Sequence, residues 1–292
     1  MLALDIKRLE LAYLDKNRRE LEITKHVSLR QLDGAALLNL RANGGCEFEL
    51  PEELFDLDFS GHYFRRIKSV SISIPCVTGP YTSVSGTLTM LSSKLRTTAV
   101  VQQAYADERN YRSTYLPLQS IATSSGQNDS GLFELNFRDE RFLPFEGGGA
   151  ISRWRFTLPK DFHAFDYSTI SDLVLHVRYT ARDGGESLSA SASQSLVDRL
   201  NDLSRAQGQG AGLVALVSVR QDFAELWQRA QRQPDVPVSL QLRDELFPFM
   251  FRSRVKAHGA VFAWTERDET GTWQVAQTEG ELDSPLNSRM PA

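Results

Sequence analysis

The chain has few cysteines. Only Cys46 and Cys76 occur in 292 residues. Two thiols exclude a disulfide-stapled scaffold and any zinc site built from several cysteines. We expect two unpaired thiols, at least one of them packed as a small apolar side chain. A single bridge between the two would also fit the count.

Long apolar runs are absent as well. No stretch of 18 apolar residues occurs, and the first residues alternate charges with leucines, as at Asp5, Lys7, Arg8 and Glu10. This pattern excludes the apolar core of a signal peptide at this end and any hydrophobic helix that spans a membrane by itself. A net charge of -4 gives no general attraction to nucleic acid or to an anionic membrane.

Sequence motifs for catalysis are missing. The glycines at 208, 210 and 212 precede an expected strand, whereas nucleotide-binding loops follow a strand and open a helix. There is no nucleophile elbow and no His-Glu-x-x-His helix. We therefore expect no catalytic residues, no cofactor and no metal.

The histidines and loop carboxylates give little sign of a site. His163 lies between two aspartates and could bind a metal, but a surface hydrogen-bonding role is the simpler interpretation. Asp56 and Asp58 alternate with apolar residues, which is typical of a solvent-facing strand edge. His176 is expected to be a hydrogen-bonded residue in or beside the core, and His26 has no visible partner.

The clearest local pattern is a strand over 68–74. Alternate positions place apolar side chains on one face and serines on the other. The apolar face holds Val70, Ile72 and Ile74, and the other face holds Ser69, Ser71 and Ser73. We predict a half-buried strand that ends near Ile74, because Pro75 lacks the N–H needed to continue a ladder.

Further strands are predicted at regular intervals, separated by polar connections rich in Gly and Ser. The predicted segments are 46–50, 87–91, 132–137, 152–158, 173–180, 213–219, 236–242, 255–264 and 273–275. The run at 173–180 has the continuous apolar start of a central strand. Many short strands with turn signals between them predict a mainly β fold, an antiparallel β-sandwich or jelly-roll-like domain with a few short helices.

Helical periodicity predicts an N-terminal helical segment. Apolar residues recur at helical spacing over 2–25, and Asp33 could cap a short helix that Gly44 would end. Shorter helices are expected around 196–203 and 223–231. We expect a helical segment at 1–45, a β-rich domain at 46–276 and a disordered tail at 277–292. The uncapped start favours the hypothesis that the chain is the C-terminal part of something longer.

Two groups of residues are candidates for an interface. Arg65, Arg66 and Lys68 form a basic cluster that is too short for a nucleic-acid patch, so salt bridges with Asp56, Asp58 or a partner's carboxylates are expected. The other candidates are aromatic: Tyr81 in the turn after Pro75, and Phe247, Phe249 and Phe251, which suit either the core or an anchor in a subunit interface.

A family resemblance is carried by the residues around the 68–74 strand. The run Gly-His-Tyr-Phe-Arg-Arg-Ile-Lys-Ser-Val at 61–70, followed by Ile-Pro-Cys-Val-Thr-Gly-Pro-Tyr at 74–81, resembles the C-terminal region of the A component of bacterial Tc (toxin complex) insecticidal toxins. Stretches at 50–56, 142–147, 154–159 and 172–185 look similar too.

The resemblance implies a function in assembly. Such A components form pentamers with a central translocation channel, and their C-terminal TcB-binding domain docks the β-propeller of the B component. The segment at 1–45 would then correspond to the end of the channel's helical region, and the parent protein would be a secreted or cell-surface toxin. The resemblance supplies no catalytic residues.

The leading hypothesis is therefore a non-enzymatic docking module that also forms a homo-oligomer. Two alternatives stay open. A carbohydrate-binding jelly roll would use exposed aromatic side chains to stack on sugars. An enzyme acting on glycans would need paired carboxylates in a cleft.

Overall fold

The computed structural model describes most of the first 233 residues. The described segments are 2–16, 19–79, 82–115, 117–125, 132–136, 143–159, 164–206 and 216–233, together with residues 236, 238–241, 243 and 246. The chain divides into two compact units, 1–214 and 215–292, and each is described by itself.

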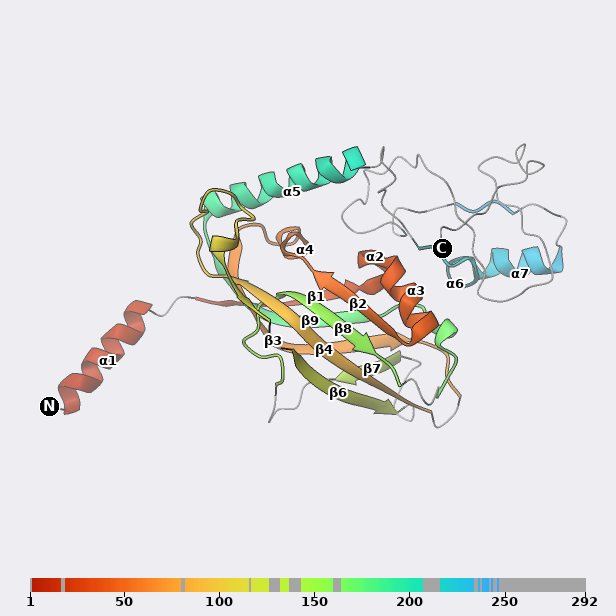
Figure 1. The fold of residues 1–292 in the computed structure, drawn as a ribbon, viewed down its shortest axis with the longest axis horizontal. Coiled ribbons are helices and arrows are strands. Elements are labelled where there is room, and N and C mark those ends of the chain that lie inside the picture. The colour runs from red at the N-terminus through yellow and green to blue at the C-terminus, as the bar shows by residue number, and fades with distance from the viewer. Residues whose placement is uncertain are drawn as a thin grey trace. The chain divides into compact units, whose positions relative to one another are not determined.

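The first unit contains two antiparallel sheets that face each other (Figure 1). Sheet A has the strand order β1 (Leu21–Ser28), β9 (Val174–Asp183), β3 (His62–Pro75) and β7 (Leu132–Asn136). Sheet B has the order β2 (Gly45–Leu50), β8 (Ile151–Thr157), β4 (Ser83–Arg96) and β5 (Tyr111–Thr114), and β6 (Leu118–Ser125) also pairs with β4. The predicted mainly β, antiparallel sandwich is confirmed.

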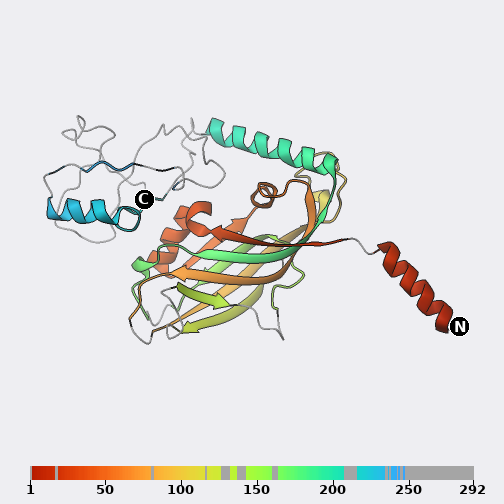
Figure 2. The same ribbon diagram turned by 180° about the vertical axis from the view of Figure 1, so that it is seen from behind.

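Strict alternation along the strands builds the core between the sheets. On β9, the side chains of Leu175, Val177, Tyr179 and Ala181 are buried, while the residues between them lie on the outer face. Trp154 and Phe156 on β8 are fully buried from the opposite sheet. A side-chain period of two thus supplies one apolar face per sheet. The predicted central position of 173–180 is confirmed, since β9 lies between β1 and β3 (Figure 2).

β3 is longer than the predicted strand and ends where predicted, at Pro75. Its serine face is not half-exposed as expected: Ser69, Ser71 and Ser73 are also buried. One reason is position, because β3 is an inner strand between β9 and β7. A second is that His176 reaches across from β9 to hydrogen-bond the Ser73 hydroxyl.

The N-terminal helix is shorter than predicted. α1 spans Leu2–Lys16, and residues 21–28 form β1 instead of continuing the helix. The prediction is wrong there because Lys25 and Val27 turn inward against the core, and β1 pairs with β9 along its whole length. Pairing with a neighbouring strand outweighs helical propensity, which is a weak preference.

In its described segments, the first unit also contains three short helices, one long helix, α5, and two 3-10 turns. They are α2 (Leu29–Leu32), α3 (Gly34–Asn43), α4 (Glu52–Asp56) and α5 (Glu186–Ala206), with 3-10 turns η1 (Glu108–Asn110) and η3 (Tyr167–Thr169). The predicted capping of α3 is confirmed. The Asp33 carboxylate accepts from the Ala36 N–H at 3.0 Å, and Gly44 adopts the left-handed conformation at φ 66°. The helix predicted around 196–203 lies within α5.

The described part of the second unit is helical. α6 spans Val219–Asp222 and α7 spans Ala224–Arg232, which confirms the helix predicted at 223–231. The strand predicted at 213–219 is wrong over 216–219, because Ser218 caps α6 by accepting a hydrogen bond from the Gln221 N–H. Described residues between 236 and 241 form no strand either. The strands predicted at 255–264 and 273–275 and the tail lie outside the described residues.

Cys46 and Cys76 do not form a disulfide. Cys46 is buried on β2, and burial raises the pKa of its thiol to about 12, so it packs as a small apolar group. Among the residues that the structure describes, no helix has the length and apolar character to cross a membrane.

Candidate docking surface

Arg65 lies inside the domain rather than on its surface. Its side chain is 3% exposed, and its guanidinium donates to Asp56 at 2.6 Å and to Glu52 at 3.3 Å. The expected salt bridge with Asp56 is confirmed. Asp56 itself is not on a solvent-facing strand edge as expected, because it is buried on α4. The interface prediction therefore rests on the other two basic residues of the cluster.

A second arginine completes this buried ion network. Arg96 on β4 donates to both carboxylate oxygens of Glu52 at 2.8 Å, and the Tyr105 hydroxyl donates to Asp56 at 2.6 Å. Burial raises the pKa of Asp56, although Arg65 opposes this effect. Burial also raises the pKa of Tyr105, so its phenol remains a hydrogen-bond donor. The network joins α4 to β3 and β4, so its contacts are structural and not part of an exposed interface.

Arg66 points the other way, to the outer face of sheet A. It is 39% exposed and donates to both oxygens of Glu20 at 3.0 and 2.9 Å. Arg182 on β9 donates to the same carboxylate at 2.8 Å. Partial burial tends to raise the pKa of Glu20, but the hydrogen bonds from Arg182 and Arg66 outweigh it and lower the pKa. One carboxylate is thus shared by two arginines.

Phe64 lies between these two arginines. The guanidinium carbon of Arg182 is 4.1 Å from the centre of its ring, and that of Arg66 is 5.0 Å away. Phe64 has a φ of 54°, in the left-handed region that a bulky residue rarely occupies. Such a conformation costs roughly 1–3 kcal/mol and occurs often at functional sites. The sequence analysis missed this residue, and its only signal is an aromatic next to two arginines.

Lys68 forms a second ion-paired group on the same face. It is 43% exposed and binds Glu22 on β1 at 2.8 Å, and Arg178 on β9 binds the same carboxylate. The hydrogen bond from Lys68 lowers the pKa of Glu22. We call the combined set the Arg/Glu surface: Glu20, Glu22, Phe64, Arg66, Lys68, Arg178 and Arg182. The structure therefore brings Arg66 and Lys68 to one surface, where each shares a glutamate with an arginine of β9.

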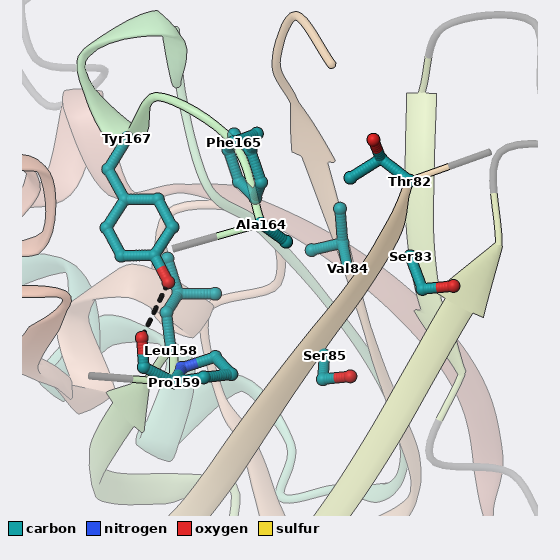
Figure 3. Close-up of a pocket in the computed structure, with 9 residues that line it drawn as sticks. All are labelled: Thr82, Ser83, Val84, Ser85, Leu158, Pro159, Ala164, Phe165 and Tyr167. Atoms are coloured by element: carbon teal, nitrogen blue, oxygen red, sulfur yellow. Dashed lines mark hydrogen bonds between the residues drawn. The ribbon is translucent and has the colours of Figure 1, made fainter. Parts of the chain in front are cut away.

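A separate pocket opens where β4 begins and β8 ends (Figure 3). Its volume is about 390 Å³, and its lining residues are Thr82, Ser83, Val84, Ser85, Leu158, Pro159, Ala164, Phe165 and Tyr167. The Phe165 and Tyr167 rings meet edge to face at 5.1 Å, and the Tyr167 hydroxyl donates to the Pro159 carbonyl at 2.7 Å. Among the described residues, the lining consists of apolar, hydroxyl and aromatic side chains.

The remaining candidates, Tyr81, Phe247, Phe249 and Phe251, lie outside the described residues. Their part in an interface stays a prediction.

Fold and surface together define a class of protein. It is an antiparallel β-sandwich with internally balanced buried charges and an ion-paired outer sheet face. Within the described segments, no group of three or more His, Cys, Asp or Glu residues could hold a metal ion. The family follows from comparison with known proteins. A family model for the Tc toxin complex TcA C-terminal TcB-binding domain matches residues 1–181, and the chain belongs to this family.

Individual proteins that are similar to this chain include one curated relative and two solved structures. Toxin subunit YenA2 from Yersinia entomophaga is 40% identical over 215 residues, which are 69% of this chain and 16% of YenA2. A structure of Yersinia pseudotuberculosis TcaA-TcaB is 24% identical with a TM-score of 0.37, covering 62% of this chain and 11% of that one. Morganella morganii TcdA4 is 22% identical with a TM-score of 0.33, covering 61% and 8%. This chain thus spans about a sixth of the curated relative's length.

Proposed function

We propose that this domain docks the B component of a Tc toxin complex, and that it acts by binding and not by catalysis. The observation that carries the proposal is the family match over residues 1–181, which runs from α1 almost to the end of β9 and so includes strands of both sheets. The parent protein would be a secreted or cell-surface bacterial toxin. The partner's docking face would be a β-propeller, as the family resemblance implies.

The Arg/Glu surface is the part of the sandwich that we assign to the partner. Arginine and aromatic side chains supply much of the affinity of protein interfaces. Here Phe64, Arg66 and Arg182 form one group on rigid strands, and a partner's carboxylate could replace or join Glu20 between the two guanidinium groups. Exposed charges of this kind mainly set the association rate and the choice of partner.

The family resemblance implies that the full-length parent is a homo-oligomer, a pentamer. Such a parent would present several copies of this surface at once. Linked copies bind a single partner with a high effective concentration, so modest contacts per copy would suffice. Native mass measurement of the full-length parent tests this part of the proposal. A monomer at micromolar concentration would contradict it.

The docking claim is tested by measuring binding of this chain, and of its full-length parent, to the cognate B component. Arg66→Ala should weaken binding by roughly tenfold or more, as loss of a hot-spot arginine does. The control is Arg153→Ala, which removes a 51% exposed ion-paired arginine from the outer face of sheet B. Absence of binding by both wild-type proteins would refute docking. Equal effects of the two substitutions would contradict the assignment of the partner contact to the Arg/Glu surface.

The pocket of Figure 3 favours a second candidate function, recognition of a saccharide. Its two aromatic rings and three hydroxyl side chains, from Thr82, Ser83 and Ser85, match the neutral, hydroxyl-rich character of sugars. Binding on a glycan array that is lost in Phe165→Ala, without binding to a B component, would favour this function over docking.

A further inference from the structure

Two histidines meet on the outer face of sheet A, two positions along β9 from Arg178 of the Arg/Glu surface. His26 on β1 lies directly opposite His176 on β9 in the strand register. Their Nδ1 atoms are 2.5 Å apart, and the rings meet edge to face with centroids 4.7 Å apart. The His26 side chain is exposed and that of His176 is half-buried, so solvent reaches the pair.

The backbone explains this close approach. The Leu29 N–H donates to the Leu173 carbonyl, so hydrogen-bonded pairs of the ladder recur at every second residue from that point. His26 and His176 therefore form a non-hydrogen-bonded pair of the antiparallel ladder. In such pairs the Cα atoms approach to about 4.5 Å and the side chains are closest. The two imidazoles are held together by strand pairing and not by a flexible loop.

Ser73 fixes the orientation of one ring. Its hydroxyl lies 2.7 Å from Nε2 of His176, on the opposite side of the ring from Nδ1. When Nε2 carries the proton and donates it to Ser73, the Nδ1 lone pair of His176 points at His26. Metal-binding histidines typically donate their second ring N–H to a neighbouring oxygen in this way.

We propose that His26 and His176 form a binding site for a divalent transition-metal ion of the Zn²⁺ type, held by their two Nδ1 atoms. Neutral imidazole is the commonest protein ligand of such ions. Two Zn–N bonds of about 2.0–2.1 Å at a tetrahedral angle need nitrogens about 3.3 Å apart. The exposed His26 ring would have to move outward by about 0.8 Å from its present contact.

The ion would occupy a site with two protein ligands. No third His, Cys, Asp or Glu joins the pair within the described parts of the chain, so water would fill the remaining positions. The nearest charged residue on this face of β9 is Arg178, and its charge is paired with Glu22. An ion bound here would cross-link β1 to β9. It would therefore stabilise the pairing of β1, which is an edge strand of sheet A.

Proton balance adds a check on this geometry. Each neutral imidazole carries one proton, and when Nδ1 binds the ion that proton lies on Nε2. If His26 carries its proton on Nδ1 before binding, it gives that proton up and takes one up at Nε2. Binding by two neutral rings should therefore release no net proton.

The test is calorimetric titration of the full chain with Zn²⁺ in two buffers of different ionisation enthalpy. We expect one site, no net proton release from neutral rings, and an affinity that rises from Co²⁺ to Ni²⁺ to Cu²⁺, with no binding of Mg²⁺. His26→Gln and His176→Gln should each weaken Zn²⁺ binding by at least about tenfold. Because His26 is exposed, its substitution should leave the circular dichroism spectrum unchanged.

The matched control is the double variant His163→Gln and His258→Gln, which removes the two histidines outside the described residues. It should keep the site. Nitrogen NMR of the histidine rings should show Zn²⁺ at Nδ1 and not at Nε2 in His26 and His176. The proposal is overturned by an absence of Zn²⁺ binding up to about 1 mM, by equal affinity in His26→Gln, or by loss of the site only in the control.

Discussion

Replacing Arg96 by methionine tests whether the buried ion network stabilises the sandwich. The Arg96 side chain is 1% exposed and donates to both carboxylate oxygens of Glu52 at 2.8 Å. It also lies 4.1 Å from the centre of the Tyr105 ring. Methionine keeps part of the side-chain volume but removes the charge. Glu52 is then left buried, with Arg65 at 3.3 Å as its nearest cation.

The expected loss of stability follows from these contacts. Hydrogen bonds to charged groups contribute about 1.5–3 kcal/mol each, and removing one partner of a buried ion pair costs about 3–5 kcal/mol. We expect Arg96→Met to lower the free energy of unfolding by about 3–5 kcal/mol, and Tm by roughly 6–20 °C at about 2–4 °C per kcal/mol. Adding Glu52→Gln removes the opposite charge. The double variant should therefore lose about 0.5–3 kcal/mol less than the sum of the single losses.

Urea unfolding followed by far-ultraviolet circular dichroism measures these free energies. The control is Arg153→Met, because the ion pair of Arg153 with Glu47 lies at the surface and should contribute only about 0–1 kcal/mol. A loss below about 1 kcal/mol for Arg96→Met, or a double variant that costs the full sum, would refute the reasoning.

Three further predictions concern separate features. An alkylating reagent at pH 8 should modify Cys76 and spare Cys46 until the chain unfolds, because burial raises the pKa of Cys46 to about 12; equal labelling by mass spectrometry would contradict this. Gly149→Ala should cost more than about 2 kcal/mol in urea unfolding, since its Cβ would lie 2.0 Å from a backbone carbonyl oxygen of β4, whereas Gly79→Ala, with 3.5 Å to its nearest atom, should be near neutral. The folded-state pKa of Glu20 is lowered, so its stabilisation is present above pH 4.5 and is lost as the pH falls through the folded value; Glu20→Gln should flatten the stability curve there, and an unchanged curve would argue against the pairing.

Local signals in the sequence were sufficient to predict many of the strands and helix ends of the sandwich. The strand around 68–74 and its end at Pro75 follow from a period of two and from a residue without an N–H. The ends of α3 follow from Asp33 and Gly44, whose cap geometry depends only on nearby backbone groups. These features need no knowledge of distant residues, and for that reason they could be predicted.

Features that depend on distant partners could not be predicted. The segment 21–28 has apolar residues compatible with a helix, and only its pairing with β9 makes it a strand. His26 showed no partner because His176 is 150 residues away in the sequence. The burial of Asp56 likewise depends on Arg65 and on Tyr105, which comes from a later segment of the chain. Strand register decides the first two cases, and side-chain contacts of α4 decide the third.

The three basic residues of β3 show how strand alternation divides one cluster between the core and the surface. The strand register shifts between Tyr63 and Arg66 and again between Ile67 and Ser69, so each shift places one extra residue in β3. The apolar pattern requires such a shift, because the inward residues are odd-numbered up to Ile67 and even-numbered from Val70 onward. A side-chain period of two cannot change phase without a bulge.

The alternation over 62–68 places the basic residues on two sides of β3. Arg65 turns inward to neutralise buried carboxylates, whereas Arg66 and Lys68 stay on the outer face. The first bulge also forces Phe64 into its left-handed conformation, between two guanidinium groups. The bulge persists because the buried ion network and the core fix the chain on both sides of it. The strain at Phe64 and the ion pairs of Arg65 are therefore parts of one arrangement, in which the interior stabilises the surface that we assign to docking.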